Sequence, residues 1–302
     1  TPSEAEGSSS SVAASSSSEV RSPCFIENAI TTKHYKDGDK EYICKNGYLE
    51  PFVRSSSSAG SSSSYYNMDS LFSSKVSYGE FTDPRDGQTY RTVREYYGSG
   101  GVDSIEVFAQ NLNYGKQVKL GTLDFDDNVV EKFCYNDDPW YCDNGFGGLY
   151  SWSETLGLPK ACDSVRVGST ESCPKVTGVV STCSLVQGSC PDGWHVMNEW
   201  EWGSMKGNYE TGSFLVSKVT GGNNLNGFSA LLGGGVGAFN SIDERVYDYM
   251  GGDANFWYPH ENDENSAKAM VFTLNKFVKG NNRLKINGFS VRCVKDYPSS
   301  CH

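Results

Sequence analysis

The residues best suited to chemistry are a histidine and the two carboxylates that follow it. His195 precedes Glu199 and Glu201, so a histidine base oriented by a carboxylate is one possible arrangement. The spacing does not match the HExxH pattern of zinc peptidases, and no serine stands in a GxSxG turn. His195 also lies between Trp194 and Val196. We therefore expect a packed, hydrogen-bonded core histidine and no enzymatic activity.

The sequence signals for a metal site and for a phosphate-binding loop are equally weak. The acidic runs 124–128, 136–138 and 261–264 could offer oxygen ligands to calcium, but none fits the EF-hand loop pattern. The Gly-rich stretch 232–237 lacks a Walker lysine and a GxGxxG frame. We expect solvated acidic turns, a Gly-rich loop, no metal and no cofactor.

The cysteines predict disulfides. There are ten, an even number, and none stands in a CxxC pair, which argues against zinc and for an oxidising compartment. A short turn separates one pair, strand-like residues flank another, and one Gly/Ser/Thr-rich insertion holds a third. The connectivity is open, and the favoured pairs are Cys134–Cys142, Cys190–Cys293, Cys173–Cys183, Cys162–Cys301 and Cys24–Cys44.

Aromatic residues are the candidate ligand-binding groups. They make up 13% of the chain, and four of them stand beside turn residues, where exposed rings could stack on sugar faces. These candidates are Trp140, Tyr141, Trp257 and Tyr258. The alternative is that Trp140 or Trp257 simply fills the core.

Charge and hydropathy exclude some partners. The formal net charge is -11, which disfavours nucleic acid and anionic membrane surfaces, because both attract an excess of Lys and Arg. No stretch reaches the 18 to 20 apolar residues of a membrane helix. The chain starts at Thr1, and we expect a mature exported product.

Composition divides the chain into four parts. Residues 1–23 form a Ser-rich arm, 24–50 a small disulfide module, 51–78 a Ser-rich linker, and 79–302 the main domain. Ser-rich segments bury too little apolar surface to order themselves. They are also candidates for O-glycosylation. The serines concerned are Ser8, Ser9, Ser10, Ser11, Ser15, Ser16, Ser17, Ser18, Ser55, Ser56, Ser57, Ser58, Ser61, Ser62, Ser63 and Ser64.

The main domain mixes short strands with two helices. Turn residues followed by alternation predict a hairpin over 81–93, and strands are expected over 105–109, 269–274 and 290–294. Helices are expected over 149–156 and 198–205, the second with Asn198 as its N-cap. In the small module, 24–26 and 41–48 are expected as paired strands. This pattern predicts an α+β fold.

A series of short motifs carries a family resemblance. Taken in order over roughly 79–296, they resemble the Fibrobacter succinogenes major paralogous domain, a family of secreted bacterial proteins. The matching segments are Asp86–Tyr90, Ala109–Tyr114, Cys134–Asp137, Gly148–Trp152, Cys190–Val196, Glu201–Trp202, Asn226–Leu231 and Gly288–Cys293.

The resemblance implies a C-type lectin-like fold, a bacterial cell-surface location and adhesion to polysaccharide. Phe256–Pro259 replaces the usual Trp-Ser-Ser turn of the family, which leaves a shared ligand open. Two functions follow as hypotheses. One is a non-catalytic module that binds polysaccharide or a cell-surface glycan. The other is a structural subunit of an extracellular filament or surface layer, joined to copies of itself through the Ser-rich arm.

Overall fold

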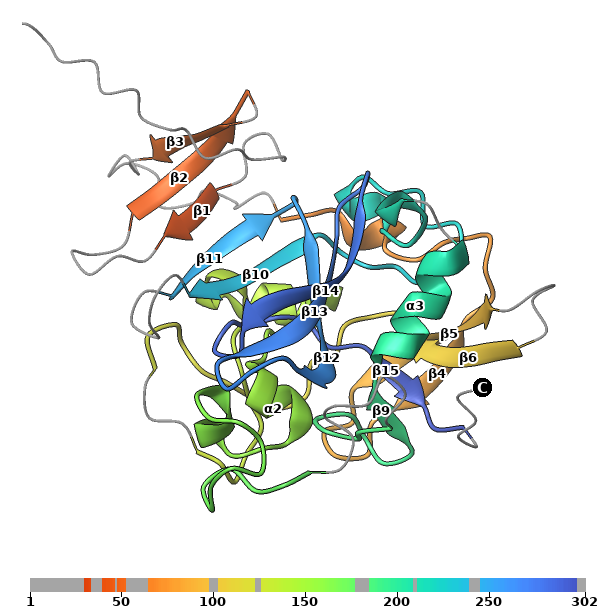
Figure 1. Ribbon diagram of the computed structural model, residues 1–302. Coiled ribbons are helices and arrows are strands. Elements are labelled where there is room, and N and C mark those ends of the chain that lie inside the picture. Colours follow the sequence, from red (N-terminus) through yellow and green to blue (C-terminus); the bar gives the residue numbers. More distant parts are fainter. Residues whose placement is uncertain are drawn as a thin grey trace, which may run out of the picture.

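The protein has an α+β fold, as predicted, built mainly from antiparallel strands (Figure 1). The computed structural model describes residues 30–33, 40–46, 48–52, 65–97, 103–122, 126–176, 185–208, 211–238 and 245–297. Within this part of the chain lie two five-stranded sheets, a three-stranded sheet and a two-stranded sheet. No helix in these ranges is long and apolar enough to cross a membrane.

The first five-stranded sheet has the order β4-β5-β6-β15-β9, and all its neighbours are antiparallel. An Asp-Gly turn at Asp86–Gly87 joins its first two strands, with Gly87 at φ 77°, so the predicted hairpin is confirmed. The strands are β4 (Gly79–Thr82), β5 (Thr89–Tyr97), β6 (Asp103–Phe108), β9 (Trp194–Val196) and β15 (Cys293–Lys295).

The second five-stranded sheet has the order β11-β10-β12-β13-β14. Two of its strands correct the sequence analysis, because the Gly-rich run expected as a loop is β10 and Phe256–Tyr258 lie inside β12. Pro259 is tolerated in β12 because the register shifts between Trp257 and Glu261. The strands are β10 (Gly233–Ala238), β11 (Arg245–Met250), β12 (Ala254–Glu261), β13 (Ser266–Phe272) and β14 (Phe277–Leu284).

The main helices are short and capped by their own sequence. In α2 (Trp152–Leu156), Ser151 Oγ accepts a bond from Glu154 N, so the helix begins three residues later than predicted. In α3 (Glu199–Asn208), Asn198 and Glu201 cap each other's backbone N–H groups at 3.0 and 2.7 Å. The remaining short elements are α1 (Pro139–Tyr141), η1 (Met68–Ser70), η2 (Tyr135–Asp137), η3 (Cys142–Phe146), η4 (Lys160–Asp163), η5 (Gly212–Phe214), η6 (Lys218–Thr220), β7 (Lys116–Gln117) and β8 (Glu131–Lys132).

The N-terminal part forms its own three-stranded sheet of β1 (Ile30–Lys33), β2 (Lys40–Lys45) and β3 (Tyr48–Phe52). Strand β2 pairs with β1 and β3, while the predicted partner 24–26 lies outside the described residues. β1 lies beside β11 of the main domain (Figure 1). Residues 65–78, assigned to the linker, pack on the domain: Leu71 is buried and its carbonyl accepts a bond from Ser217 Oγ at 2.9 Å.

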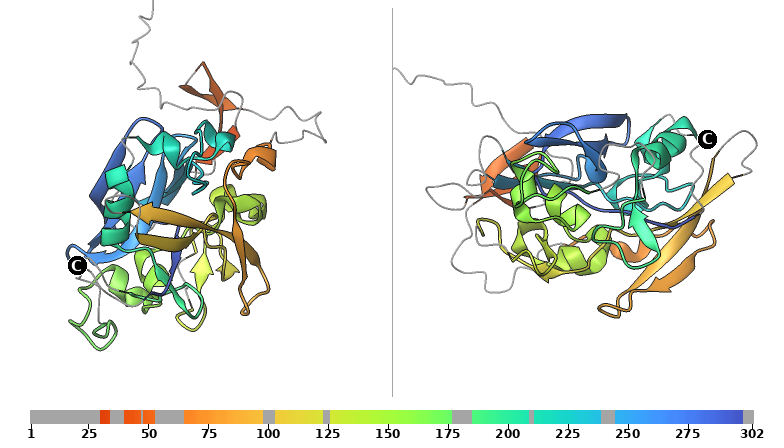
Figure 2. Two further views of the ribbon diagram at one scale, coloured as in Figure 1. Left: turned by 90° about the vertical axis from the view of Figure 1, so that its right-hand side faces the viewer. Right: turned by 60° about the horizontal axis from the view of Figure 1, so that its bottom comes forward.

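The core joins the two large sheets through α3, which contacts β5 on one side and β12 and β14 on the other (Figures 1 and 2). Trp202 of α3 packs against Phe256, Phe228 and Phe272. Beside this cluster lies Arg292, 1% exposed. Its guanidinium donates to the carbonyls of residues 108, 228 and 229 and to the Oδ1 atom of residue 111. Burial lowers its pKa to about 9, and the charge of Glu95 offsets this only in part.

Three disulfides lie in the described residues, two of them as predicted. These are Cys134–Cys142 and Cys190–Cys293, the second spanning 103 residues. The third corrects the prediction, because Cys162 pairs with Cys173. This excludes both Cys173–Cys183 and Cys162–Cys301. The reason is that η4 brings Cys162 to within 5.1 Å (Cα–Cα) of Cys173. The even number of cysteines could not reveal this proximity. The Cys24–Cys44 bridge and all candidate serines lie outside the described part.

Candidate functional site

The candidate site begins where two parallel strands separate. β10 and β12 pair at Gly234 and Ala254 alone, and beyond that point the segment 288–290 enters between them. Gly288 bridges to Val236 on one side, and Ser290 to Phe256 on the other. This close approach requires a glycine at 235, because a Cβ there would lie 2.8 Å from the carbonyl oxygen of Gly288.

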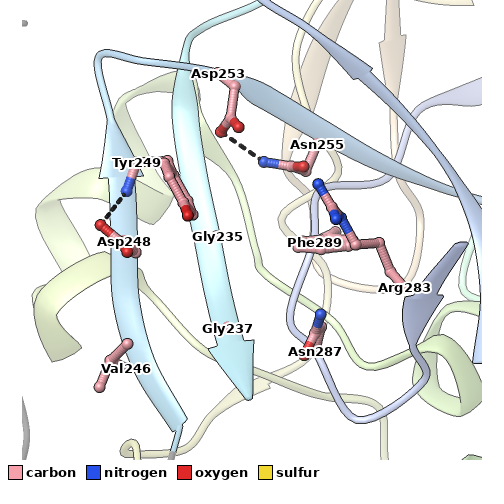
Figure 3. Close-up of a pocket in the computed structure, with 10 residues that line it drawn as sticks. All are labelled: Gly235, Gly237, Val246, Asp248, Tyr249, Asp253, Asn255, Arg283, Asn287 and Phe289. Atoms are coloured by element: carbon pink, nitrogen blue, oxygen red, sulfur yellow. Dashed lines mark hydrogen bonds between the residues drawn. The ribbon is translucent and has the colours of Figure 1, made fainter. Parts of the chain in front are cut away.

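On one face of β10 the glycines carry no side chains, and this leaves a cavity of about 200 Å³. A Cβ at Gly237 would meet nothing within 4 Å, so this glycine opens into the cavity. The volume is below the roughly 300–1,000 Å³ of drug-sized ligand sites and suits one small polar unit. The lining residues come from four strands and two connecting segments: Gly235, Gly237, Val246, Asp248, Tyr249, Asp253, Asn255, Arg283, Asn287 and Phe289 (Figure 3).

Tyr249 stands at the rim in an unusual conformation. Its φ is 62°, in the left-handed region that costs a residue with a Cβ about 1–2 kcal/mol. It lies next to Gly234 of β10, whose φ is 59° and whose Cβ position lies 2.7 Å from the Tyr249 carbonyl carbon. Its side chain is 59% exposed. A strained, solvent-facing aromatic residue at a cavity is an indication of function.

Asp253 is the most perturbed group of the cavity. Its Oδ1 accepts a bond of 2.8 Å from the Asn255 side-chain amide, which also donates to the Gly234 carbonyl at 3.3 Å. Burial raises the pKa of Asp253 to about 6, and nearby Asp248 adds to the rise. The Asn255 bond and the Arg283 charge oppose it. The carboxyl group therefore changes its charge near neutral pH.

Arg283 faces the cavity from the side opposite Tyr249 (Figure 3). It makes no hydrogen bond or ion pair with any residue that the structure describes. A guanidinium carries five N–H donors in a planar fork, so this residue presents free donors to an occupant. Together with the carboxyl and amide groups of Asp253 and Asn255, the cavity can both donate to and accept from a hydroxylated ligand.

The four aromatic candidates predicted from the sequence do not line this cavity. For two of them, the predicted exposure to solvent is wrong. Trp257 and Tyr258 are both 0% exposed, because β12 runs through the core. Trp257 Nε1 donates to the Tyr150 carbonyl at 2.9 Å. Its ring packs 4.7 Å from that of Phe289, so Trp257 supports the cavity floor from the core side, as the alternative core interpretation expected.

Trp140 and Tyr141 are half-buried and covered by the chain itself. Tyr65 stacks on Trp140 with ring centroids 4.2 Å apart and planes inclined by 16°. The Tyr65 hydroxyl donates to Asp138 Oδ2 at 2.9 Å. The structure therefore does not bring these two candidates together with Trp257 and Tyr258 into one surface.

His195 is the buried, hydrogen-bonded core residue that we predicted. Its two ring nitrogens lie 2.8 Å from carboxylate oxygens of Glu201 and Asp296. Because a carboxylate only accepts hydrogen bonds, this geometry favours the imidazolium form, in which both nitrogens donate. Burial alone would lower the pKa of His195, but the two carboxylates outweigh it and the pKa is raised. No group of three or more His, Cys, Asp or Glu able to hold a metal occurs among the described residues.

A second, wider hollow of about 710 Å³ lies beside the Asp-Gly turn of the β4–β5 hairpin. Lys132 lines it but donates to both the backbone and side-chain oxygens of Asn113. The Asn113 amide donates in turn to Gln88 at 3.2 Å. Lys132, Asn113 and Gln88 are therefore already hydrogen-bonded to one another.

Sequence reasoning missed the residues of the cavity. Tyr249, Asp253 and Arg283 belong to strands or turns that carried no motif. One signal was present: in β10, Gly233, Gly235 and Gly237 alternate, and alternate residues share one face of a strand. Such a bare face marks a close approach of backbone or ligand.

Comparison with known proteins supports the family resemblance. The model of the Fibrobacter succinogenes major domain matches residues 108–295. No curated protein and no solved structure gives a significant match. The match spans more than half of the chain and includes β10–β14, which carry the cavity. The chain therefore belongs to the Fibrobacter succinogenes major domain family.

Proposed function

We propose that the protein is a non-catalytic extracellular surface protein that binds a polysaccharide or cell-surface glycan. The observation that carries the proposal is the cavity at β10, which the exposed Tyr249 lines from one side and Arg283, unpaired among the described residues, lines from the other (Figure 3). This site replaces the four aromatic residues expected from the sequence.

The chemistry of the cavity suits sugar hydroxyls. Planar carboxyl, amide and guanidinium groups accept and donate in fixed directions, as Asp253, Asn255 and Arg283 can here. A tyrosine ring adds apolar area with a polar tip. The cavity volume of about 200 Å³ admits a terminal or branching sugar unit rather than a long chain segment.

An extracellular location is supported by the disulfides. Three bridges in the described residues are typical of an oxidising environment. We further propose that the fold is related to C-type lectin-like domains and that the protein acts at a bacterial cell surface. The two short helices, the antiparallel sheets and the long disulfide-linked segments support that relation.

The test is retention on polysaccharides and glycan arrays. We expect Gly237→Val to abolish binding, because Gly237 lines the cavity and the new side chain would occupy the open space at its Cβ position. Tyr249→Ala should weaken binding, whereas Tyr96→Ala should not, since Tyr96 is similarly exposed, at 57%, on the other five-stranded sheet. Unchanged binding by Gly237→Val would refute the site.

The same samples test catalysis. Two carboxylates in different environments are the usual requirement of glycoside hydrolysis, and Asp248 and Asp253 both line the cavity. We expect no release of reducing ends from any glycan that binds. Release that disappears in Asp253→Asn would make the protein a hydrolase.

A structural subunit of an extracellular filament or surface layer is the second candidate. The separate three-stranded sheet β1–β3 favours it, because Tyr48 on β3 is 47% exposed and could join a neighbouring copy. Sedimentation of the full chain at increasing concentration tests this role. A monomer at all concentrations would dismiss it.

A further inference from the structure

We propose that the cavity at β10 recognises an isolated uronic acid unit of a glycan, whose carboxylate binds Arg283 while Asp253 bonds a hydroxyl of the same sugar. This inference depends on the proposed glycan-binding function and specifies its ligand. The ligand charge, the pH and the residues beside Arg283 each affect this recognition, and each effect can be measured by itself.

Arg283 supplies the argument for an acidic sugar. A guanidinium next to carboxylates usually pairs with one of them, and both Asp248 and Asp253 line the same cavity. Arg283 nonetheless makes no hydrogen bond or ion pair with a described residue, while Asp253 binds Asn255 and Asp248 accepts from the backbone N–H of Tyr249 at 2.8 Å. The guanidinium N–H donors, which no described residue uses, can therefore bind a planar anion from outside the protein.

The net charge limits the ligand to isolated acidic units. At -11, the protein repels a continuous polyanion such as an all-uronic-acid chain. A mostly neutral glycan with single acidic substituents avoids this repulsion. The cavity volume of about 200 Å³ also agrees with one unit.

The other groups that face Asp253 decide how recognition depends on pH. They are Asp248 and Tyr249 from β11, Arg283 from β14 and Asn255 from β12. Burial raises the pKa of Asp253 to about 6. Above that pH its carboxylate repels the ligand carboxylate; below it, the neutral group can donate a hydrogen bond. The ligand carboxyl group, with a pKa of about 3.5 like an α-carboxyl group, remains ionised from pH 7.5 to 5.

Binding of the acidic sugar should therefore tighten as pH falls from 7.5 to 5. If only the protonated form of Asp253 binds, the dissociation constant improves by at most about 30-fold. The matched neutral sugar should show no such change, because it carries no carboxylate to repel.

The experiment uses the full chain and titration calorimetry with four probes: the methyl glycosides of glucuronic and galacturonic acid and of their neutral counterparts, glucose and galactose. We expect one of the uronides to bind at least tenfold more tightly than its neutral counterpart at pH 5. Arg283→Gln should remove this preference with little change in the thermal midpoint, since Arg283 makes no hydrogen bond or ion pair with a described residue and acts on Asp253 through charge alone. Asp253→Asn should retain the preference and abolish its pH dependence.

The outcomes separate the inference from the proposed function. Equal binding of acidic and neutral probes, or a preference that survives Arg283→Gln, overturns the inference and leaves glycan binding standing. If none of the four probes binds while the glycan arrays remain positive, the inference is again overturned and glycan binding still stands. Failure of both the probes and the arrays overturns the proposed function as well. A pH effect that persists in Asp253→Asn overturns the role of Asp253.

Discussion

Replacing Tyr249 by alanine and by glycine separates backbone strain from ring contacts. Both variants lose the same ring. At 59% exposed, the side chain buries about 80 Å² on folding, worth roughly 2 kcal/mol at about 25 cal/mol per Å². Alanine retains the Cβ that makes a φ of 62° unfavourable, whereas glycine adopts this region freely.

The free energy of unfolding should therefore fall by about 2 kcal/mol in Tyr249→Ala and by only about 1 kcal/mol in Tyr249→Gly. Urea unfolding of the disulfide-intact protein measures both values. For a domain of this size, the two variants should differ in thermal midpoint by about 2–4 °C.

Tyr96 supplies the matched control. It is 57% exposed and lies in β5 without a positive φ. There the usual order should hold, with Tyr96→Ala more stable than Tyr96→Gly by about 0.5–1 kcal/mol. If alanine is also the more stable substitution at position 249, the argument from left-handed strain is wrong.

Three further outcomes are expected. The raised pKa of His195 stabilises the folded state. This stabilisation is complete below the unfolded-state pKa of about 6.5 and is lost as the pH rises through the folded-state pKa. Urea unfolding between pH 6 and 9 should show this loss in the wild type and not in His195→Gln. Arg292→Lys should destabilise the protein by about 2–4 kcal/mol, because one ammonium group cannot satisfy all the buried oxygens that the guanidinium reaches; a loss below about 1 kcal/mol would contradict this. Gly235→Ala should cost about 1–3 kcal/mol through the 2.8 Å contact with residue 288, whereas Gly237→Ala should lower the thermal midpoint by no more than about 1 °C.

Local signals in the sequence determined the elements that depend on near neighbours. The Asp-Gly turn predicted the β4–β5 hairpin, and Asn198 as N-cap placed the start of α3. The Cys134–Cys142 bridge followed from a separation of 8 residues across a turn. These features need contacts only within a few residues, so composition and spacing were enough. The family motifs then indicated the domain as a whole.

Tertiary structure alone decided the burial of the aromatic residues and the third disulfide. Trp257 stands beside turn-forming residues in the sequence, yet β12 carries it into the core. Tyr65, ahead of the main domain, covers Trp140. Cys162 meets Cys173 because η4 turns the chain toward it. Each outcome depends on which distant segment packs against the residue, and periodicity does not record that.

The cavity belongs to the same class of feature. Its glycines were visible in the sequence as an alternating run, but their purpose depends on the segment 288–290 entering between β10 and β12. Only that long-range insertion places Arg283 opposite Tyr249 and Asp253 (Figure 3). The sequence by itself thus determined the family, the α+β class and the local turns and caps. The packing of segments far apart in the chain decided where a ligand could bind, because no local pattern encodes the meeting of remote side chains.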